Sequence, residues 1–126
     1  FVLLGGLVPE ILCSGSRYFW DLVDEEGDPL EALARRYLLR APCPRMHPFQ
    51  RRADHLQQLA GEFRVDGVIS QAIKFCDLHA GIFPVVEGGF KEIGLPVLQL
   101  EREYTLTGVG QLKTRIGAFL EQLGYY

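Results

Sequence analysis

Three segments of the chain carry apolar residues at the spacing of an amphipathic helix. In each segment these residues recur three and four positions apart, with charged residues on the other side. The three sets are Leu30, Leu33, Ala34, Tyr37 and Leu38; Leu56, Leu59, Ala60 and Phe63; and Leu112, Ile116, Phe119, Leu120 and Leu123. A single apolar stripe with charge opposite predicts a helix that lies on another part of the protein.

Residues at the ends of these segments are typical helix boundaries. Asp28 can cap the first helix through its carboxylate, and Pro29 suits the first helical position. The glycines of "GVGQ" at 108–111 are expected to open the last helix, and Gly124 is expected to end it. Asp77 is a candidate cap for a further helix that follows a cysteine.

Short apolar runs without a helical period lie between these segments: "FVLL" at 1–4, "GVIS" at 67–70 and "PVLQL" at 96–100. Their length and β-branched content favour buried parallel strands. The stretch 77–94 predicts one more helix, made irregular by Pro84 and by two adjacent glycines. Strands that alternate with helices predict an α/β fold, a parallel-sheet, flavodoxin- or Rossmann-like three-layer domain with helices on both faces.

The 126 residues suffice for a single domain, 1–126, with one modest core. One join is unusual, because only Gly5 and Gly6 separate "FVLL" from "LVPEIL", whereas a parallel crossover needs a dozen residues or more. Either the second piece is not a parallel neighbour, or residues are missing between positions 6 and 7. A strand that begins at residue 1 also predicts a missing N-terminal portion.

Composition excludes several classes of partner. The formal net charge of −3 gives no sign of a nucleic-acid surface, and no run approaches the roughly 20 apolar residues that span a bilayer. The arginines between positions 35 and 52 form a cluster, which we interpret as a solvated helical face, with phosphate binding as the alternative. Three cysteines without a secretory signal favour reduced thiols in the cytoplasm.

Two of these cysteines are candidate ligands. Cys43 lies between Pro42 and Pro44, which make the backbone extended and stiff, and Cys76 ends the apolar run that begins at 67. They are 33 positions apart, about one strand–helix unit. Because ligands collect at the carboxyl ends of parallel strands, both thiols could face one crevice.

Three interpretations of these thiols remain open on the residues alone. They could be two unrelated buried cysteines, since free cysteine is among the most buried residue types. They could join His47 and His79 in a zinc site, because these histidines follow the cysteines by four and three positions. They could also bind an iron–sulfur cluster, although two thiolates are too few for a usual four-thiolate cluster.

Several stretches together resemble the subunits of 2-hydroxyacyl-CoA dehydratases and class I benzoyl-CoA reductases, which form one superfamily. They are "CSGSRYFW" at 13–20, "DPLEALARRYL" at 28–38, "PCPRMHPFQRR" at 42–52, "VDGVISQAIKFCD" at 65–77, "GLPVLQLEREYT" at 94–105 and "GQLKTRIGAFLEQL" at 110–123. The most specific feature is the cysteine bracketed by prolines, followed one strand–helix unit later by "KFC".

The resemblance implies a low-potential [4Fe–4S] cluster held by three cysteines. Two of them match Cys43 and Cys76 in this C-terminal domain, and the third belongs to an N-terminal domain without a counterpart here. Cys13 does not match a ligand and is expected to be a core or loop thiol. In the dehydratases the cluster passes one electron to the thioester carbonyl of an acyl-CoA, forming a ketyl radical; in the reductases electrons enter an aromatic ring.

The resemblance also implies partners: a paralogous subunit, in a heterodimer or larger assembly, and an ATP-hydrolysing iron–sulfur activator protein. A catalytically inactive scaffold or partner subunit is the alternative to an enzyme subunit. Residues 17–20, "RYFW", are expected to pack at an interface or to line the acyl-CoA pocket. Lys74 is expected either to tune the cluster or touch a CoA phosphate, or to be a surface lysine. No side chain stands out as a general acid or base.

Overall fold

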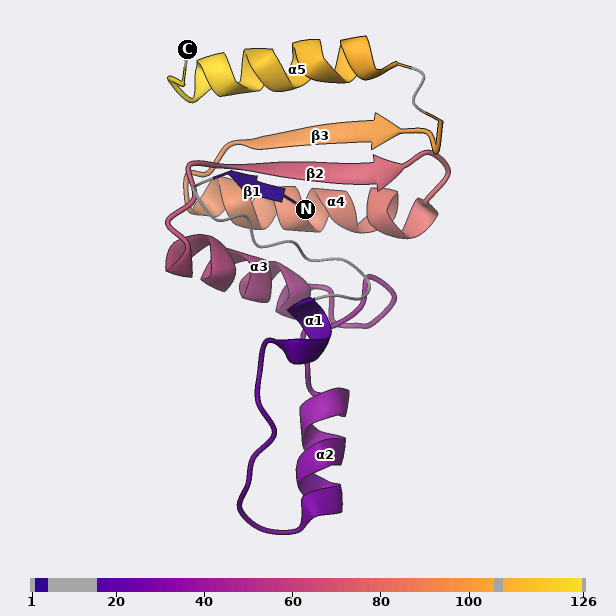
Figure 1. Ribbon diagram of the computed structural model, residues 1–126, viewed down its shortest axis with the longest axis vertical. Coiled ribbons are helices and arrows are strands. Elements are labelled where there is room, and N and C mark those ends of the chain that lie inside the picture. The colour runs from indigo at the N-terminus through magenta and orange to yellow at the C-terminus, as the bar shows by residue number, and fades with distance from the viewer. Residues whose placement is uncertain (1, 5–15, 106–107, 126) are drawn as a thin grey trace.

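A computed structural model describes residues 2–4, 16–105 and 108–125 (Figure 1). Its elements in chain order are β1 (Val2–Leu4), α1 (Ser16–Phe19), α2 (Pro29–Leu38), α3 (Gln50–Glu62), β2 (Gly67–Ile73), α4 (Asp77–Glu92), β3 (Val97–Arg102) and α5 (Val109–Gln122). The α/β class is therefore confirmed. Among the described residues, none of the helices combines the length and the apolar character that a bilayer-spanning segment needs.

The three strands form one sheet in the order β1-β2-β3. Strands β2 and β3 are parallel, with Val68 opposite Val97 and Ile73 opposite Arg102, as the two apolar runs predicted. The prediction of a parallel strand in the first run is wrong, because β1 pairs with β2 in the antiparallel direction. A run of three apolar residues satisfies either direction, so its composition does not specify the pairing.

Two apolar clusters lie on the two sides of β2. Successive side chains of a strand point to opposite faces, so Val68 and Ile69 belong to different clusters. In Figure 1, α5 lies above the strands, and α4 and α3 lie below them. The cluster shared by α3, α4 and β2 contains Leu56, Leu59, Ala60, Val65, Val68, Ile82, Val86 and Phe90. The cluster beneath α5 contains Ile69, Leu100 and Phe119, with Leu98, Leu112, Ile116 and Leu123 packed against it.

Most helix ends are where the sequence predicts them. The Asp28 carboxylate accepts hydrogen bonds from the amides of Leu30 (2.7 Å) and Glu31 (3.1 Å), and Pro29 is the first residue of α2. Helix α5 begins directly after Gly108, and Gly124 ends it with a φ of +84°. These predictions are confirmed, since each follows from local chemistry.

The prediction that Asp77 caps α4 is wrong. Cys76 occupies the cap position, and its carbonyl oxygen accepts hydrogen bonds from the amides of His79 and Ala80, both at 3.1 Å. Asp77 is already the first helical residue. The chain turns one residue earlier than expected because Phe75 adopts a φ of +67°.

Helix α4 runs without a break from 77 to 92, although Pro84 lies inside it, so the expected irregularity is wrong. A proline inside a helix removes one amide donor and crowds the carbonyl group four residues earlier, but the buried side chains Ile82, Val86 and Phe90 hold the helix on both sides of it. Gly89 allows α3 to approach, because a β carbon there would lie 3.2 Å from Gln57 Nε2.

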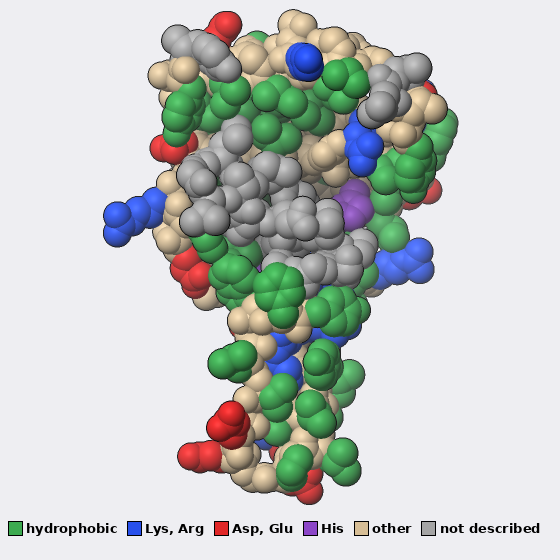
Figure 2. All heavy atoms as spheres, in the orientation of Figure 1, with side chains coloured by type: hydrophobic (Ala, Val, Ile, Leu, Met, Phe, Trp, Pro, Cys, Tyr) green, Lys and Arg blue, Asp and Glu red, His purple; other side chains and the backbone are tan. Residues whose placement is uncertain are grey.

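Helix α2 projects from the rest of the chain, and apolar side chains cover much of that projection (Figures 1 and 2). Its predicted apolar stripe is open to solvent, with Leu30 77% and Leu38 70% exposed. The buried positions of α2 are instead Ala32 and Arg36. Within the part of the chain that the structure describes, the stripe therefore lies on nothing.

Candidate functional site

Cys43 lies in the loop between α2 and α3. Its thiol is free and half-buried, whereas Pro42 and Pro44 on either side are buried. The Cys43 carbonyl oxygen accepts a hydrogen bond of 2.9 Å from the amide of Met46, which closes a turn. The buried prolines and this turn fix the backbone while the thiol stays accessible.

Cys76 lies in the turn that joins the carboxyl end of β2 to α4. Its amide donates a hydrogen bond of 2.9 Å to the carbonyl oxygen of Ile73, so the turn is anchored to the strand. The Cys76 thiol is free, is half-buried and makes no capping hydrogen bond to the helix. The thiol is therefore available to a ligand.

The fold brings both loops to the same edge of the sheet. Helix α3 ends where β2 begins, and its 13 residues run back over about 20 Å. Strand β2 covers a similar distance with seven residues, about 23 Å. The loop before α3 and the turn after β2 therefore both lie at the carboxyl ends of β2 and β3, on the right of Figure 1.

Arg52 provides a link between the two loops. Its side chain, on the first turn of α3, is only 1% exposed, and Nη1 donates a hydrogen bond of 3.0 Å to the carbonyl oxygen of Pro42. On the other side, burial first and the positive charge of Arg52 second lower the pKa of His79, which lies on the first turn of α4. The guanidinium is thus hydrogen-bonded to the Cys43 loop, and its effect on His79 is that of its charge.

Within the described ranges, no three His, Cys, Asp or Glu side chains come together as a metal site. The zinc set of Cys43, Cys76, His47 and His79 is therefore not assembled. The exposed His47 ring packs on Phe49, with ring centroids 3.9 Å apart. Cys13 lies outside the described residues.

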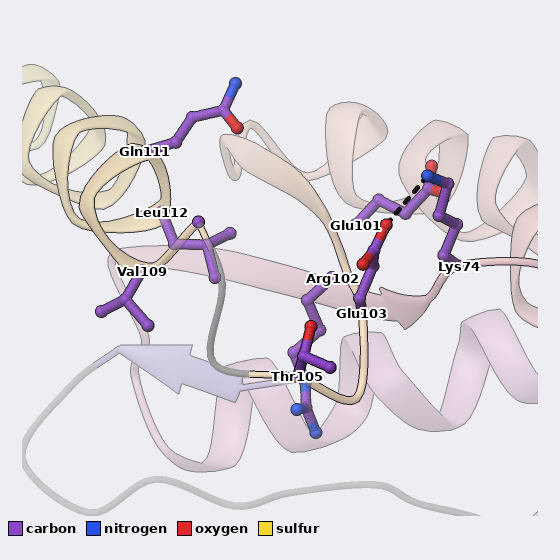
Figure 3. Close-up of a pocket in the computed structure, with 9 residues that line it drawn as sticks. Lys74, Glu101, Arg102, Glu103, Thr105, Val109, Gln111 and Leu112 are labelled. Carbon is purple, nitrogen blue, oxygen red and sulfur yellow. Dashed lines mark hydrogen bonds and ion pairs between the residues drawn. The ribbon is translucent and has the colours of Figure 1, made fainter.

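A cavity of about 400 Å³ opens between the end of β3 and the start of α5 (Figure 3). Lys74, two positions before Cys76, contributes to its wall. The Lys74 ammonium group pairs with the carboxylate of Glu103 at 3.0 Å, and this hydrogen bond raises the pKa of Lys74. Lys74 is therefore a surface lysine with a carboxylate partner. The remaining walls come from Glu101, Arg102, Glu103, Thr105, Gly108, Val109, Gln111 and Leu112.

Arg17 and Trp20 of the segment "RYFW" at 17–20 contact other parts of the chain. Arg17 is buried, and its Nε donates a hydrogen bond of 2.7 Å to the carbonyl oxygen of Ala41. The Trp20 ring meets Phe63 at the end of α3, with centroids 5.6 Å apart. The Arg17 bond supports the chain just before Cys43, whereas Phe19 is 69% exposed, so packing at an interface and lining of the acyl-CoA pocket both stay predictions.

The interpretation of the arginine cluster as a solvated face is wrong at two positions. Arg36 is 9% and Arg52 is 1% exposed, whereas Arg35 and Arg51 lie in solvent. The charge pattern of the sequence did not identify Arg52 as a buried residue. The helical spacing does contain the signal, because Leu56 lies four positions after it on the same buried stripe.

Together these features define an α/β domain with two free thiols presented on loops at the carboxyl edge of its parallel strands. The sequence profile of the family described as "2-hydroxyglutaryl-CoA dehydratase, D-component" matches residues 5–123. The chain belongs to this family, and the predicted superfamily is confirmed.

Three curated relatives agree with the family. The chain is 32% identical over 112 residues to the "Putative dehydratase subunit YjiM" of Escherichia coli (strain K12), covering 88% of this chain and 29% of the relative. It is 28% identical over 117 residues to the "(R)-phenyllactyl-CoA dehydratase beta subunit" of Clostridium sporogenes, covering 93% and 31%. It is 28% identical over 104 residues to the "Lactoyl-CoA dehydratase subunit beta" of Anaerotignum propionicum, covering 82% and 28%. The chain thus spans less than a third of these relatives.

Proposed function

We propose that this chain is the cluster-binding C-terminal part of a subunit of a 2-hydroxyacyl-CoA dehydratase-type enzyme that acts on an acyl-CoA thioester. One structural observation carries the proposal: two free cysteines, distant in sequence, lie on loops at the same edge of the parallel strands. Two of the relatives are named as dehydratase beta subunits, and their names give phenyllactyl-CoA and lactoyl-CoA as substrates. Ring reduction, as in the benzoyl-CoA reductases, is the related alternative.

Cys43 and Cys76 fit an iron–sulfur cluster by their chemistry. Thiolates are the usual ligands of such clusters, and both thiols are free and half-buried. When bound, a [4Fe–4S] cluster supplies single electrons at low potential and, with three cysteine ligands, one iron open to another ligand. The two residues supply part of the ligand set, and a third cysteine is expected from an N-terminal domain.

Other residues of the chain fix the backbone around the two cysteines. Buried Pro42 and Pro44 hold the Cys43 backbone stiff, and the hydrogen bond to Ile73 anchors the Cys76 turn to β2. Fixed ligand directions are what a metal site requires from its surroundings. Helix α4, which starts at Cys76, is held on the sheet by Ile82 and Val86, both in the buried core. We expect the complete fold to be a flavodoxin-like three-layer domain in the cytoplasm.

A paralogous subunit and an ATP-hydrolysing activator are the proposed protein partners. The relatives are named as subunits, which supports assembly with another chain. The open apolar stripe of α2 supports a further protein surface as a neighbour, either the expected N-terminal domain or a partner subunit, because exposed apolar surface on a projecting helix is stabilised by burial.

Metal analysis after anaerobic reconstitution tests the proposal. The wild-type protein is expected to retain iron and sulfide, and Cys43→Ser or Cys76→Ser is expected to lose them. Cys13→Ser serves as the control and should retain both. Zinc that depends on His47 and His79 as well would establish the zinc alternative, and a protein without bound metal would establish the inactive scaffold.

A further inference from the structure

Arg52 is a charged side chain that the fold has removed from water. At 1% exposure it is among the largest fully buried side chains of the described residues. Burial of a guanidinium group is costly unless its donors and its charge are used. The burial of a charge at this position, next to a proposed ligand loop, therefore points to a specific role for Arg52.

One direction of its action is the Cys43 loop. Arg52 Nη1 donates a buried hydrogen bond of 3.0 Å to the carbonyl oxygen of Pro42, the residue directly before Cys43. The Arg52 amide donates a hydrogen bond of 3.0 Å to the carbonyl oxygen of Phe49, which fixes the arginine in the first turn of α3. The loop is therefore fastened to a rigid helix.

The other direction is α4, on which α3 packs. Leu56 of α3 and Ile82 of α4 belong to one buried cluster, and the charge of Arg52 contributes to the lowered pKa of His79. The His79 amide donates a hydrogen bond of 3.1 Å to the carbonyl oxygen of Cys76. Arg52 thus fastens the backbone that carries one thiol to helix α3, which packs on the helix that starts at the other thiol.

Arg51 offers an internal comparison. It neighbours Arg52 on α3 and also donates to the same connection, through a hydrogen bond of 3.1 Å from Nη2 to the carbonyl oxygen of Leu39. Arg51 is exposed, however, and its bond lies in solvent. Exposed polar contacts contribute little because water replaces them, so Arg51 is a matched control for Arg52.

We propose that Arg52 is a positioning residue that sets the separation of the Cys43 and Cys76 thiols and adds a permanent positive charge beside the group they bind. The role of the charge rests on the proposed function, because it requires a bound cluster. The separation of the thiols does not, because it is a property of the protein without a cluster.

A lysine at position 52 distinguishes the effect of the hydrogen-bond geometry from the effect of the charge. Arginine presents a planar fork of donors, whereas lysine carries the same charge on a flexible stem with a compact head. Arg52→Lys therefore keeps the charge and loses the fixed bond to Pro42. Arg52→Met fills a similar volume and loses both.

Thiol cross-linking in the complete protein tests the separation. After metal removal, the protein is treated with a short bifunctional thiol reagent, and the Cys43–Cys76 product is quantified by mass spectrometry. Wild type and Arg51→Met are expected to cross-link efficiently, and Arg52→Lys and Arg52→Met several-fold less. Circular dichroism verifies that each variant is folded, and if Arg52→Met does not fold, Arg52→Lys carries the test.

Potentiometry of the reconstituted protein tests the charge. Loss of a positive charge beside a cluster makes its reduction potential more negative. Arg52→Met is expected to show a more negative midpoint potential than wild type, and Arg52→Lys a potential near that of wild type.

The positioning role of Arg52 and the proposed function can be overturned separately. Equal cross-linking in wild type and both folded Arg52 variants would overturn the inference, as would no Cys43–Cys76 product in wild type. A midpoint potential unchanged in Arg52→Met would overturn its charge component. Cross-linking as expected, in a protein that binds no iron, would leave the positioning role intact and overturn the proposed function.

Discussion

Gly67 and Leu123 meet so closely that a β carbon built on Gly67 would lie 2.9 Å from Leu123 Cδ1. The same β carbon would lie 3.0 Å from Phe119 Cζ. Gly67 is the first residue of β2, so this contact sets how closely α5 packs on the sheet. The contact requires the absence of a side chain at position 67.

Gly67→Ala is expected to destabilise the protein by about 1–3 kcal/mol, because the extra methyl group must displace packed side chains. Urea denaturation measures the change. Gly117→Ala on α5 is the matched control, since no atom lies within 4 Å of a β carbon there. That variant should gain about 0.5–1 kcal/mol from better helix propensity. Equal stability of both variants would show that α5 does not pack as described.

Removal of the Asp28 carboxylate should loosen the start of α2. Asp28→Ala loses the hydrogen bonds to the amides of Leu30 and Glu31, a loss of about 1 kcal/mol for a helix cap. Because α2 projects from the body, the effect should be local, with faster hydrogen exchange in α2 and little change in α3. Asp28→Asn, which also caps well, should exchange as wild type does; an unchanged rate in Asp28→Ala would argue against the cap.

Acidification should destabilise the fold through two histidines. Burial is the main cause that lowers the pKa of His79 and of His55 below the ordinary value of 6.5. Between the lowered folded value and 6.5 the unfolded chain binds more protons, so the free energy of unfolding falls as the pH falls through this range. The contribution is fully present above 6.5.

Denaturation of wild type and His79→Gln at about pH 7.5 and about pH 5.5 checks this sign. The drop in the free energy of unfolding should be smaller in the variant, which has one group fewer to protonate. A drop of the same size in both proteins would mean that His79 titrates alike in the folded and unfolded states.

Local chemistry made much of the fold predictable. The cap at Asp28, the proline after it and the glycine at 124 each determine a helix end within a few residues. The apolar runs located β2 and β3, although β2 extends three residues and β3 two residues past the predicted stretch. The early start of α3 at Gln50 was not predicted, because its first turn, "QRRA", is mostly polar.

Features that depend on distant parts of the chain were not predictable. The direction of β1 depends on its partner, and the burial of Arg52 depends on the Pro42 loop that covers it. For the candidate site, the sequence and the family resemblance selected Cys43 and Cys76. The common edge follows from the connection of α3 to β2, and the link through Arg52 required coordinates.

Thiol protection shows whether Cys43 and Cys76 bind one cluster, and it requires no substitution. The complete protein is loaded with iron and sulfide anaerobically, alkylated, and mapped by mass spectrometry before and after cluster removal by a chelator. We expect Cys43 and Cys76 both to be protected in the loaded protein and both to be alkylated after the cluster is removed. Alkylation of either thiol at the same rate in the two states would contradict it.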